Sequence, residues 1–316
     1  MTLAGQTTNV QVPNICFGTA PLGSMPNTYG YAVSEEQAYQ TVEAILTSDA
    51  PFLDTSRNYG DGRSEERIGA AIKRMGGLPE GAVISTKLDR DMETRRFDAD
   101  RARRSLEESL SVLGIAKIDV LHLHDPEYAR DLDEVSGALD ALFKMKEEGF
   151  AGAVGLAMGR IDLMSDLLNN WDFDTLISHN RFTLVNREAD QVFDLAHRKG
   201  TAIFNAAPYA GGVLAKGANE FPRYVYQEAD EAALAPVRQI ETICAEYNVP
   251  IGAVALQFSM RDPRIASTIC GVSKPERVAQ TLDWANHEIP QAAWQALAAV
   301  PYSSEDPEAS RIYDPG

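Results

Sequence analysis

The chain has 316 residues, 44% of them hydrophobic and 24% charged, which is enough to bury a large core as one or two domains. Its 46 acidic and 29 basic side chains give a formal net charge of −17, which argues against nucleic acid or an anionic membrane surface as a partner. No apolar run approaches the roughly 20 residues that a membrane span needs, and the N-terminus lacks a signal-peptide pattern, so we expect a cytoplasmic protein.

Short runs rich in β-branched and apolar residues alternate with longer segments of helical periodicity along nearly the whole chain. This alternation is typical of βα units around a parallel sheet. In chain order, the predicted strands are residues 15–20, 51–54, 83–87, 119–124, 151–156, 175–178, 202–205 and 266–270. Eight such units in a chain of this length favour a closed barrel over an open sheet.

Two further features of the sequence agree with a barrel. Residues 18–23 lack the Gly-rich fingerprint that follows the first strand of an open dinucleotide-binding sheet. No internal repeat, low-complexity tract or linker marks a domain boundary. We therefore predict the α/β class and a single (β/α)8 TIM barrel domain over residues 1–316.

Helix signals lie between the predicted strands. Ser34 and Gln37 form a capping box, in which the Ser34 hydroxyl accepts from a backbone N–H and Gln37 reaches back, so a helix should begin there. After Phe97, apolar residues recur on one helical face, which predicts a helix that packs on the sheet. Residues 208–230 are rich in Gly and Tyr and are predicted to be a long functional loop.

Polar residues stand at or just after the ends of three consecutive predicted strands. Asp54 ends the second strand and Tyr59 follows in the next turn, while Lys87 and His124 end the third and fourth strands. Alternation along a strand places Lys87 on the same face as Ser85, and His124 on the same face as His122. If these faces point inward, the four side chains meet at the mouth of the barrel.

This arrangement suits proton transfer. A lysine inside a barrel is costly unless it is paired, and Asp54 on the adjacent strand is the natural partner of Lys87. The ammonium would lower the pKa of the Tyr59 hydroxyl, which could then exchange a proton while His124 holds a carbonyl oxygen. Taken singly, each residue also fits an ordinary structural role: Lys87 in solvent, Tyr59 as a packing aromatic and Asp54 in a turn.

These residues fall in segments that resemble the aldo-keto reductase superfamily. Residues 52–60 (FLDTSRNYG) and 62–69 (GRSEERIG) resemble its signature, residues 84–87 (ISTK) its lysine strand and residues 119–126 (DVLHLHDP) its histidine strand. The resemblance covers essentially the whole chain. It implies a TIM barrel, a nicotinamide cofactor, no metal, and the catalytic tetrad Asp54, Tyr59, Lys87 and His124.

The chain departs from the common pattern of the family after the fifth, sixth and seventh strands. Ala157 and Met158 stand where many members have Ser-Asn, and His179 or Asn180 replaces a Gln. After the seventh strand, where a tyrosine often stacks on the nicotinamide, the run at 205–214 is NAAPYAGGVL. These features resemble the aldose 1-dehydrogenase branch, which includes sugar dehydrogenases of the fucose, galactose and arabinose type and pyridoxal 4-dehydrogenases. The branch implies oxidation of a cyclic hemiacetal to a lactone.

The resemblance also implies a set of cofactor contacts. Gly271 and Val272 replace a Lys-Ser pair that commonly clamps the 2′-phosphate of NADP, which favours NAD, with NADP as the alternative. The residues expected to contact the cofactor are Gly18, Thr19, Ala20, Asp54, His179, Asn180, Ala207, Pro208, Gly211, Gly212, Leu214, Gly271, Val272, Ser273, Lys274, Arg277 and Gln280.

The substrate is expected to be a small carbonyl compound or sugar. Aromatic side chains suit both a sugar face and a pyridine ring. The residues expected to contact it are Tyr29, Tyr59, His124, Tyr128 and Tyr209, with Met25, Tyr31, Tyr302 and Tyr313 as further candidates for the pocket. Pyridoxal oxidation and general aldehyde or ketone reduction are alternative activities, and the sequence does not indicate an oligomeric state.

Two other classes of function also fit parts of the sequence. His122 and His124 could be a strand-borne metal pair with His179 and Asp54, although such barrels usually carry the pair on the first strand. The second alternative is a non-catalytic barrel that binds the cofactor as a sensor. The intact tetrad argues against this alternative. The three cysteines, Cys16, Cys244 and Cys270, are expected to be reduced, buried thiols.

Overall fold

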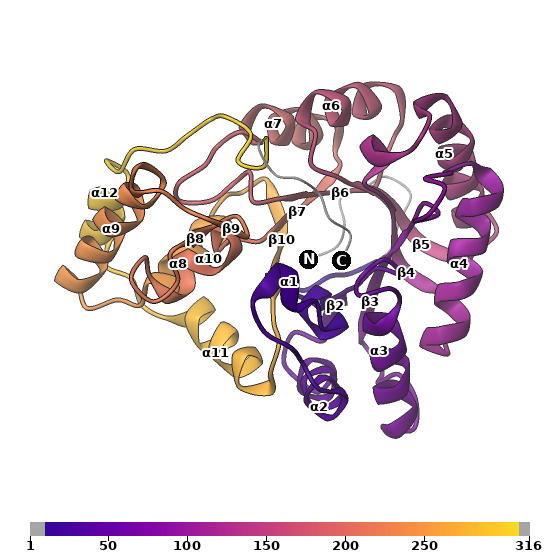
Figure 1. The fold of residues 1–316 in the computed structure, drawn as a ribbon, viewed down its shortest axis with the longest axis horizontal. Helices are drawn as coiled ribbons and strands as arrows, with labels where there is room; N and C mark the ends of the chain where they lie inside the picture. Colours follow the sequence, from indigo (N-terminus) through magenta and orange to yellow (C-terminus); the bar gives the residue numbers. More distant parts are fainter. Residues whose placement is uncertain (1–9, 310–316) are drawn as a thin grey trace.

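A computed structural model describes residues 10–309. Eight parallel strands form a closed barrel in the order β1-β10-β7-β6-β5-β4-β3-β2, at the centre of Figure 1. They are β1 (Ile15–Gly18), β2 (Phe52–Asp54), β3 (Val83–Leu88), β4 (Ile118–His124), β5 (Ala151–Ala157), β6 (Thr175–His179), β7 (Ala202–Ala206) and β10 (Ile265–Gly271). Because all eight run parallel, their carboxyl ends open at one rim.

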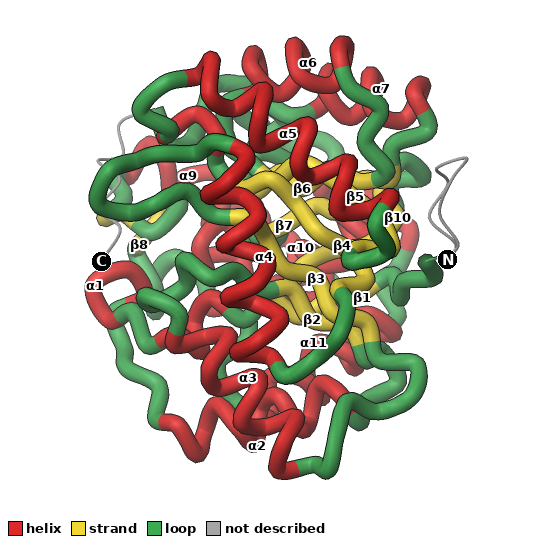
Figure 2. Tube along the Cα trace, turned by 90° about the vertical axis from the view of Figure 1, so that its right-hand side faces the viewer, coloured by secondary structure: helices red, strands yellow, loops and turns green. Residues whose placement is uncertain are grey.

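Helices surround the strands, as Figure 2 shows. They are α1 (Pro26–Tyr29), α2 (Glu35–Leu46), α3 (Arg63–Arg74), α4 (Ala99–Leu113), α5 (Leu132–Glu147), α6 (Ile161–Asn170), α7 (Asp190–Lys199), α8 (Val213–Lys216), α9 (Glu231–Glu246), α10 (Ile251–Met260), α11 (Pro275–Asn286) and α12 (Gln291–Leu297). Three short 3-10 turns accompany them: η1 (Ala20–Gly23), η2 (Pro126–Tyr128) and η3 (Ala210–Gly212). The predicted (β/α)8 barrel is confirmed.

All eight predicted strands are present, with shifts at their ends. β1 ends at Gly18 and not at residue 20, because Pro21 lies in the first turn of η1 and has no N–H for a strand ladder. The capping box at α2 forms only in part. The Ser34 hydroxyl accepts from the Gln37 backbone N–H at 3.2 Å, but the Gln37 amide donates to the Ser273 carbonyl at 2.6 Å. Gln37 therefore ties α2 to the segment after β10 and does not reach back to Ser34.

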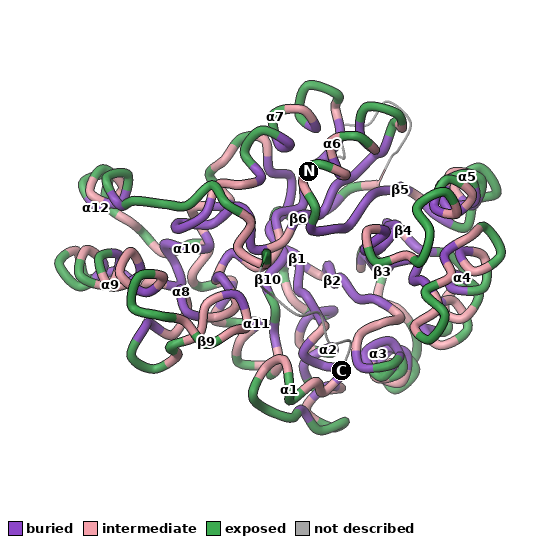
Figure 3. Tube along the Cα trace, turned by 45° about the horizontal axis from the view of Figure 1, so that its top comes forward, coloured by how far each residue is buried: buried purple, intermediate pink, exposed green. Residues whose placement is uncertain are grey.

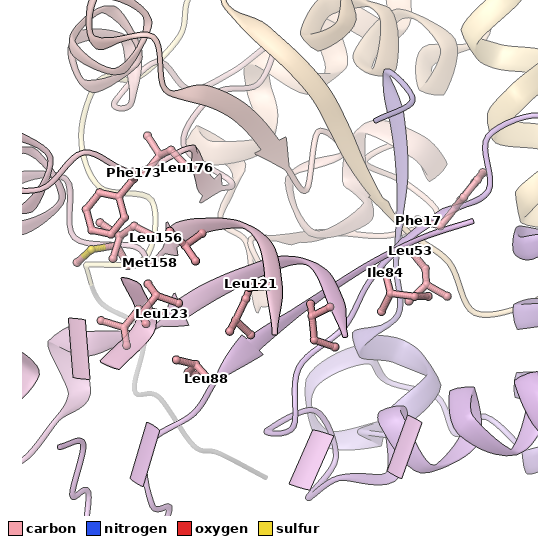
Figure 4. Packing of buried hydrophobic residues seen from close by; sticks show 14 of the residues in the cluster. Phe17, Leu53, Ile84, Leu88, Leu121, Leu123, Leu156, Met158, Phe173 and Leu176 are labelled. Atoms are coloured by element: carbon pink, nitrogen blue, oxygen red, sulfur yellow. The ribbon is translucent and has the colours of Figure 1, made fainter. Parts of the chain in front are cut away.

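Strand alternation divides the core into two layers. Phe52, Val83, Val120 and Phe204 belong to one buried cluster inside the barrel. The strand residues that alternate with the inward-facing ones face the helices. Figure 4 shows a group of them, among them Leu53, Ile84 and Leu121. Figure 3 shows the same division as buried strands inside a ring of helices with exposed outer faces. Polar side chains at inward positions near the carboxyl ends therefore face the mouth.

The segment after β7 was predicted to be a long loop, and this is wrong in part. It contains η3, α8 and a two-stranded hairpin of β8 (Arg223–Tyr224) and β9 (Gln227–Glu228). Leu214 and Val213 of this segment join a second hydrophobic cluster with α9 and α10. This packing holds Gly211 and Gly212, both at positive φ, over the rim of the barrel.

Candidate functional site

A cavity of about 660 Å³ opens at the carboxyl ends of the strands. Its wall contains the four side chains that the sequence singled out: Asp54, Tyr59, Lys87 and His124. A volume of this size is typical of a small-molecule or cofactor site. The site therefore lies where a parallel barrel is expected to carry it.

Lys87 and Asp54 form a buried ion pair. Their exposed fractions are 2% and 4%, and the Lys87 Nζ lies 2.6 Å from Asp54 Oδ2. The same ammonium donates to the Thr55 carbonyl at 2.6 Å, and the Ser85 hydroxyl donates to Asp54 Oδ1 at 2.8 Å. Both charges thus have partners, which offsets the cost of removing them from water.

Tyr59 lies beside this ion pair, in the turn between β2 and α3. The Lys87 Nζ is 4.9 Å from the centre of the Tyr59 ring, and the Tyr59 and His124 rings meet edge to face at 5.8 Å. Gly60, at φ +63°, follows Tyr59, and a Cβ there would collide with the Gly23 carbonyl. The glycine lets the turn approach η1 closely and so fixes the direction of the tyrosine.

His124 has a partner that the sequence argument missed. Its Nδ1 lies 2.6 Å from Asp89 Oδ1, and both side chains are buried. The Ser56 hydroxyl donates to Asp89 Oδ2 at 2.7 Å and lies 3.1 Å from His124 Nδ1. Alternation past Ser85 and Lys87 reaches Asp89, so extending the inward face of β3 by one step would have found it.

The carboxylates around His124 decide its charge. Burial by itself lowers the pKa of the imidazole, but Asp125, whose Oδ2 is 3.7 Å from Nε2, and Asp89 outweigh burial and raise it overall. Burial opposes the charge on Asp89, yet the neighbouring His124 lowers the pKa of that carboxyl. The site therefore favours a charged pair.

His122 lies one layer deeper in the barrel. It is fully buried, and its Nε2 is 3.0 Å from the Thr175 hydroxyl, a hydrogen bond typical of a core residue. Burial, then Lys87 and His124, lower the pKa of His122, so it is neutral. Within residues 10–309, no three His, Cys, Asp or Glu side chains gather in a way that could hold a metal ion.

Three cations line the cavity between α8 and α11. They are Lys216, Lys274 and Arg277, of which Lys216 was not predicted. Burial lowers the pKa of the Lys216 amine, and Arg277 and Lys274 lower it further, so the three charges repel one another. Like charges that converge in a cavity favour an anion between them. This part of the wall fits the phosphates of a dinucleotide.

The structure brings most of the predicted contact residues to the cavity wall. These are Gly18, Ala20, Asp54, His179, Ala207, Gly211, Gly212, Gly271, Ser273, Lys274, Arg277 and Gln280 for the cofactor, and Tyr29, Tyr59, His124 and Tyr209 for the substrate, with Met25 and Tyr31 beside them. Asn58, Asp125, Phe221 and Trp284 also line it and were not predicted.

The remaining predicted residues lie off the wall. They are Thr19, Asn180, Pro208, Leu214, Val272, Tyr128 and Tyr302, while Tyr313 falls outside the described residues. The Thr19 hydroxyl donates to the Asp54 carbonyl at 2.9 Å, and Leu214 and Val272 pack in hydrophobic clusters. Thr19, Leu214 and Val272 therefore support the site from behind the cavity wall.

Tyr209 lines the cavity but packs toward α11. Its ring meets Trp284 edge to face at 5.9 Å. Burial, together with the neighbouring Cys270 thiol, raises the pKa of its hydroxyl well above the usual value, so Tyr209 is a phenol and not a proton-exchanging group. All three cysteines, Cys16, Cys244 and Cys270, are buried and free, as expected.

A protein-family model matches most of the chain. The model of the Aldo/keto reductase family matches residues 14–301. The chain belongs to the aldo/keto reductase family. This aldo/keto reductase is an NAD(P)-dependent oxidoreductase. Within residues 10–309, no helix combines the length and apolar character that a membrane crossing requires.

Curated relatives and solved structures cover nearly the whole reductase chain. A pyridoxal 4-dehydrogenase from Microbacterium luteolum is 28% identical over 92% of this chain and 94% of its own. A D-threo-aldose 1-dehydrogenase from a Pseudomonas species is 29% identical, over 93% and 96%. The solved structure of an aldo-keto reductase from Bacillus halodurans, in its holo form, has a TM-score of 0.75 and 18% identity over 97% of both chains, a likeness of fold.

Residues 303–309, the C-terminal segment of the described chain, are anchored beside the cavity. Arg181, which is buried, lies 3.1 Å from Glu308, 2.6 Å from Asp306 and 3.0 Å from Glu188. Glu308 also lies 2.8 Å from His179 Nε2 and accepts from the Asn180 amide at 3.1 Å. His179 at the cavity wall and the buried Asn180 are therefore both tied to this segment.

Arg181→Gln is expected to release that segment. Three carboxylates would then face one another without their cation, and an anchoring loss of about 1.4 kcal/mol raises the opened fraction tenfold. We expect limited proteolysis to cleave the variant near residue 305 at least about tenfold faster than the wild type. Arg181→Lys keeps the charge without the planar fork and should lie between the two. Equal cleavage rates for all three proteins would contradict the anchoring role.

Proposed function

We propose that this aldo/keto reductase oxidises the anomeric carbon of an aldose to the lactone. The observation that carries the proposal is the meeting of Tyr59 and His124 at the mouth of the barrel with Asn58 and Asp125, polar side chains that suit sugar hydroxyls. The similarity to a D-threo-aldose 1-dehydrogenase over most of both chains supports the same substrate class.

The residues of the cavity fit a nicotinamide dinucleotide. Lys216, Lys274 and Arg277 would hold its phosphates. Gly211, on the same wall, lets η3 pack against the turn of the β8–β9 hairpin, because a Cβ there would be 2.8 Å from the Tyr226 backbone nitrogen. When bound, the nicotinamide ring would accept a hydride in oxidation or donate one in reduction.

The protein residues move and hold the proton. In oxidation, the hydroxyl proton of the hemiacetal passes to Tyr59, whose phenolate is favoured by the Lys87 ammonium next to its ring. Asp54 keeps that ammonium charged and fixed. His124 binds the same substrate oxygen and orients the anomeric carbon. In reduction, Tyr59 returns the proton to the carbonyl oxygen.

The test is a substrate panel. Purified protein is mixed with NAD and with aldoses of the fucose, galactose and arabinose type, pyridoxal and simple aldehydes, and the absorbance of reduced nicotinamide is followed. We expect turnover with at least one aldose and formation of its lactone. Turnover with pyridoxal alone would favour pyridoxal 4-dehydrogenase activity. The polar groups of pyridoxal also suit a carboxylate such as Asp125. Cofactor binding without turnover of any compound would favour a sensor.

We propose NAD as the preferred cofactor. Gly271 carries no charge, and Val272 is buried in the hydrophobic core, so a 2′-phosphate lacks one cation there. A charge-assisted contact contributes about 1.5 to 3 kcal/mol, so we expect kcat/KM with NAD to exceed that with NADP at least about tenfold. A Cβ at Gly271 meets open space, with Pro21 4.0 Å away, so Gly271→Lys should fit and improve the use of NADP. A wild type that prefers NADP would contradict the assignment.

A further inference from the structure

We propose that Asp89, supported by Ser56, is a positioning residue that fixes the proton of His124 on Nδ1 and leaves Nε2 as the nitrogen that faces the substrate oxygen. The role of His124 in catalysis rests on the proposed function. The protonation of His124 does not, because the contacts that set it lie within the protein. Asp89 is the first residue after β3, and His124 is the last of β4.

The hydrogen-bond partners of Asp89 define the directions of the protons. The Asn58 backbone N–H donates to Asp89 Oδ2 at 3.0 Å, and the Ser56 hydroxyl donates to the same oxygen at 2.7 Å. Asp89 Oδ1, 2.6 Å from His124 Nδ1, can only accept, because the carboxyl is ionised. Since Ser56 gives its only proton to Asp89, it too can only accept from Nδ1. Both neighbours of Nδ1 are thus acceptors.

A nitrogen surrounded by acceptors carries a proton in both charge states of the ring. The neutral form of His124 is then the Nδ1–H tautomer, and the proton that comes and goes with pH is the one on Nε2. With that proton, Nε2 donates to a carbonyl oxygen. Without it, Nε2 has no proton to donate, and it cannot accept the hemiacetal proton, which passes to Tyr59. The Nε2–H group is therefore the form that holds the substrate oxygen in both directions.

The charged groups around His124 set the pH at which this change occurs. They are Asp89 and Lys87 from β3 and its loop, Asp125 after β4, His122 on β4, and Tyr59 and Asp54 from β2 and its turn. The two nearest carboxylates hold the proton on the ring, and Lys87 opposes them. Because the pKa of His124 is raised overall, the Nε2–H donor persists to higher pH, and kcat/KM should fall in both directions as the pH rises through that pKa.

Asp89→Asn tests the proposal because the orientation of the new amide is dictated by its neighbours. The N–H of Asn58 and the hydroxyl of Ser56 both require an acceptor, so the amide oxygen must take the place of Oδ2. The amide NH2 then faces His124 Nδ1 and displaces its proton. The neutral ring becomes the Nε2–H tautomer, and its charged form is disfavoured.

We expect Asp89→Asn to lower kcat/KM roughly tenfold below the pKa of His124, because a neutral donor replaces a charged one. The His124 limb of the pH profile should disappear, because Nε2 then keeps its proton at every pH. In a His124→Gln background, the same change should cost less than about threefold, because Asp89 acts through that ring. Asp91→Asn makes the same chemical change two residues further along the loop, where the side chain contacts Thr94, and should leave the profile unmoved. An equal loss in both backgrounds would show a merely structural role and overturn the proposal.

Nitrogen NMR of ¹⁵N-histidine-labelled protein gives a readout that needs no turnover. The His124 signals are assigned by comparison with His124→Gln. We expect the wild type to show a protonated Nδ1 across the titration and Asp89→Asn to lose it. An unprotonated Nδ1 in the neutral wild-type ring would overturn the proposal even if the sugars are oxidised. If no substrate is turned over but Nδ1 is protonated as expected, the proposed function fails and the positioning of His124 stands.

Discussion

Tyr59→Phe is expected to lower kcat by roughly 10² to 10⁴-fold, the range that a positioned proton-transfer group contributes. The substitution removes only the hydroxyl. The ring still packs edge to face with His124 and beside the Lys87 ammonium, so the fold and the cavity should be unchanged. Steady-state kinetics with the aldose identified in the panel measures the loss.

Cofactor binding controls for an indirect effect of Tyr59→Phe. Trp284 lines the cavity, so its fluorescence is expected to report binding of the dinucleotide. We expect the wild type and the variant to bind it with dissociation constants within about threefold, because a lost transition-state contact lowers kcat and leaves ground-state binding intact. A variant that keeps more than a tenth of the wild-type kcat would remove Tyr59 from the mechanism.

Lys87→Met is expected to have the largest effect on stability. The substitution leaves the Asp54 carboxylate buried without its cation, and losing one partner of a buried pair costs about 3 to 5 kcal/mol. Denaturation with urea should show this loss as a lower free energy of unfolding. Turnover should also be lost, because the positive charge beside Tyr59 is gone.

The double variant Lys87→Met and Asp54→Asn separates the two roles of the pair. With the negative charge also removed, no uncompensated ion is buried, and most of the stability should return. Activity should not return, since neither neutral side chain favours the Tyr59 phenolate. A double variant that unfolds as easily as Lys87→Met would show that the cavity left by the lysine, and not the buried charge, causes the loss.

Strand alternation made the barrel and the catalytic residues predictable. Each strand contributes every second residue to the interior, so alternation grouped Lys87 with Ser85 and His124 with His122 on one face, which the structure shows to point inward. Asp54 was placed with them as the charge partner of Lys87 on the adjacent strand. The closed sheet then brings adjacent strand ends within hydrogen-bond distance. Asp89 obeys the same rule and was missed because the predicted strand stopped at residue 87.

The rest of the site depends on loops, where no periodicity relates sequence to direction. Asn180 was predicted to contact the cofactor, but its left-handed backbone, at φ +61°, directs the side chain into the protein toward Glu308. Glu308 and His179 are 129 residues apart in the chain and meet where Arg181 and its neighbours hold the C-terminal segment. Lys216 likewise reaches the cavity through the packing of α8 against α10. Contacts of this kind follow from tertiary packing and have no local sequence signal.

Hydride transfer from the anomeric carbon is tested most directly with a labelled sugar. An aldose deuterated at C1 is incubated with the protein and NAD, and the reduced nicotinamide and the sugar product are examined by mass spectrometry. Our account predicts one deuterium in the reduced nicotinamide, none in the lactone, and no transfer with Tyr59→Phe over the same time. Unlabelled reduced nicotinamide, or transfer that persists at the wild-type rate in Tyr59→Phe, would contradict it.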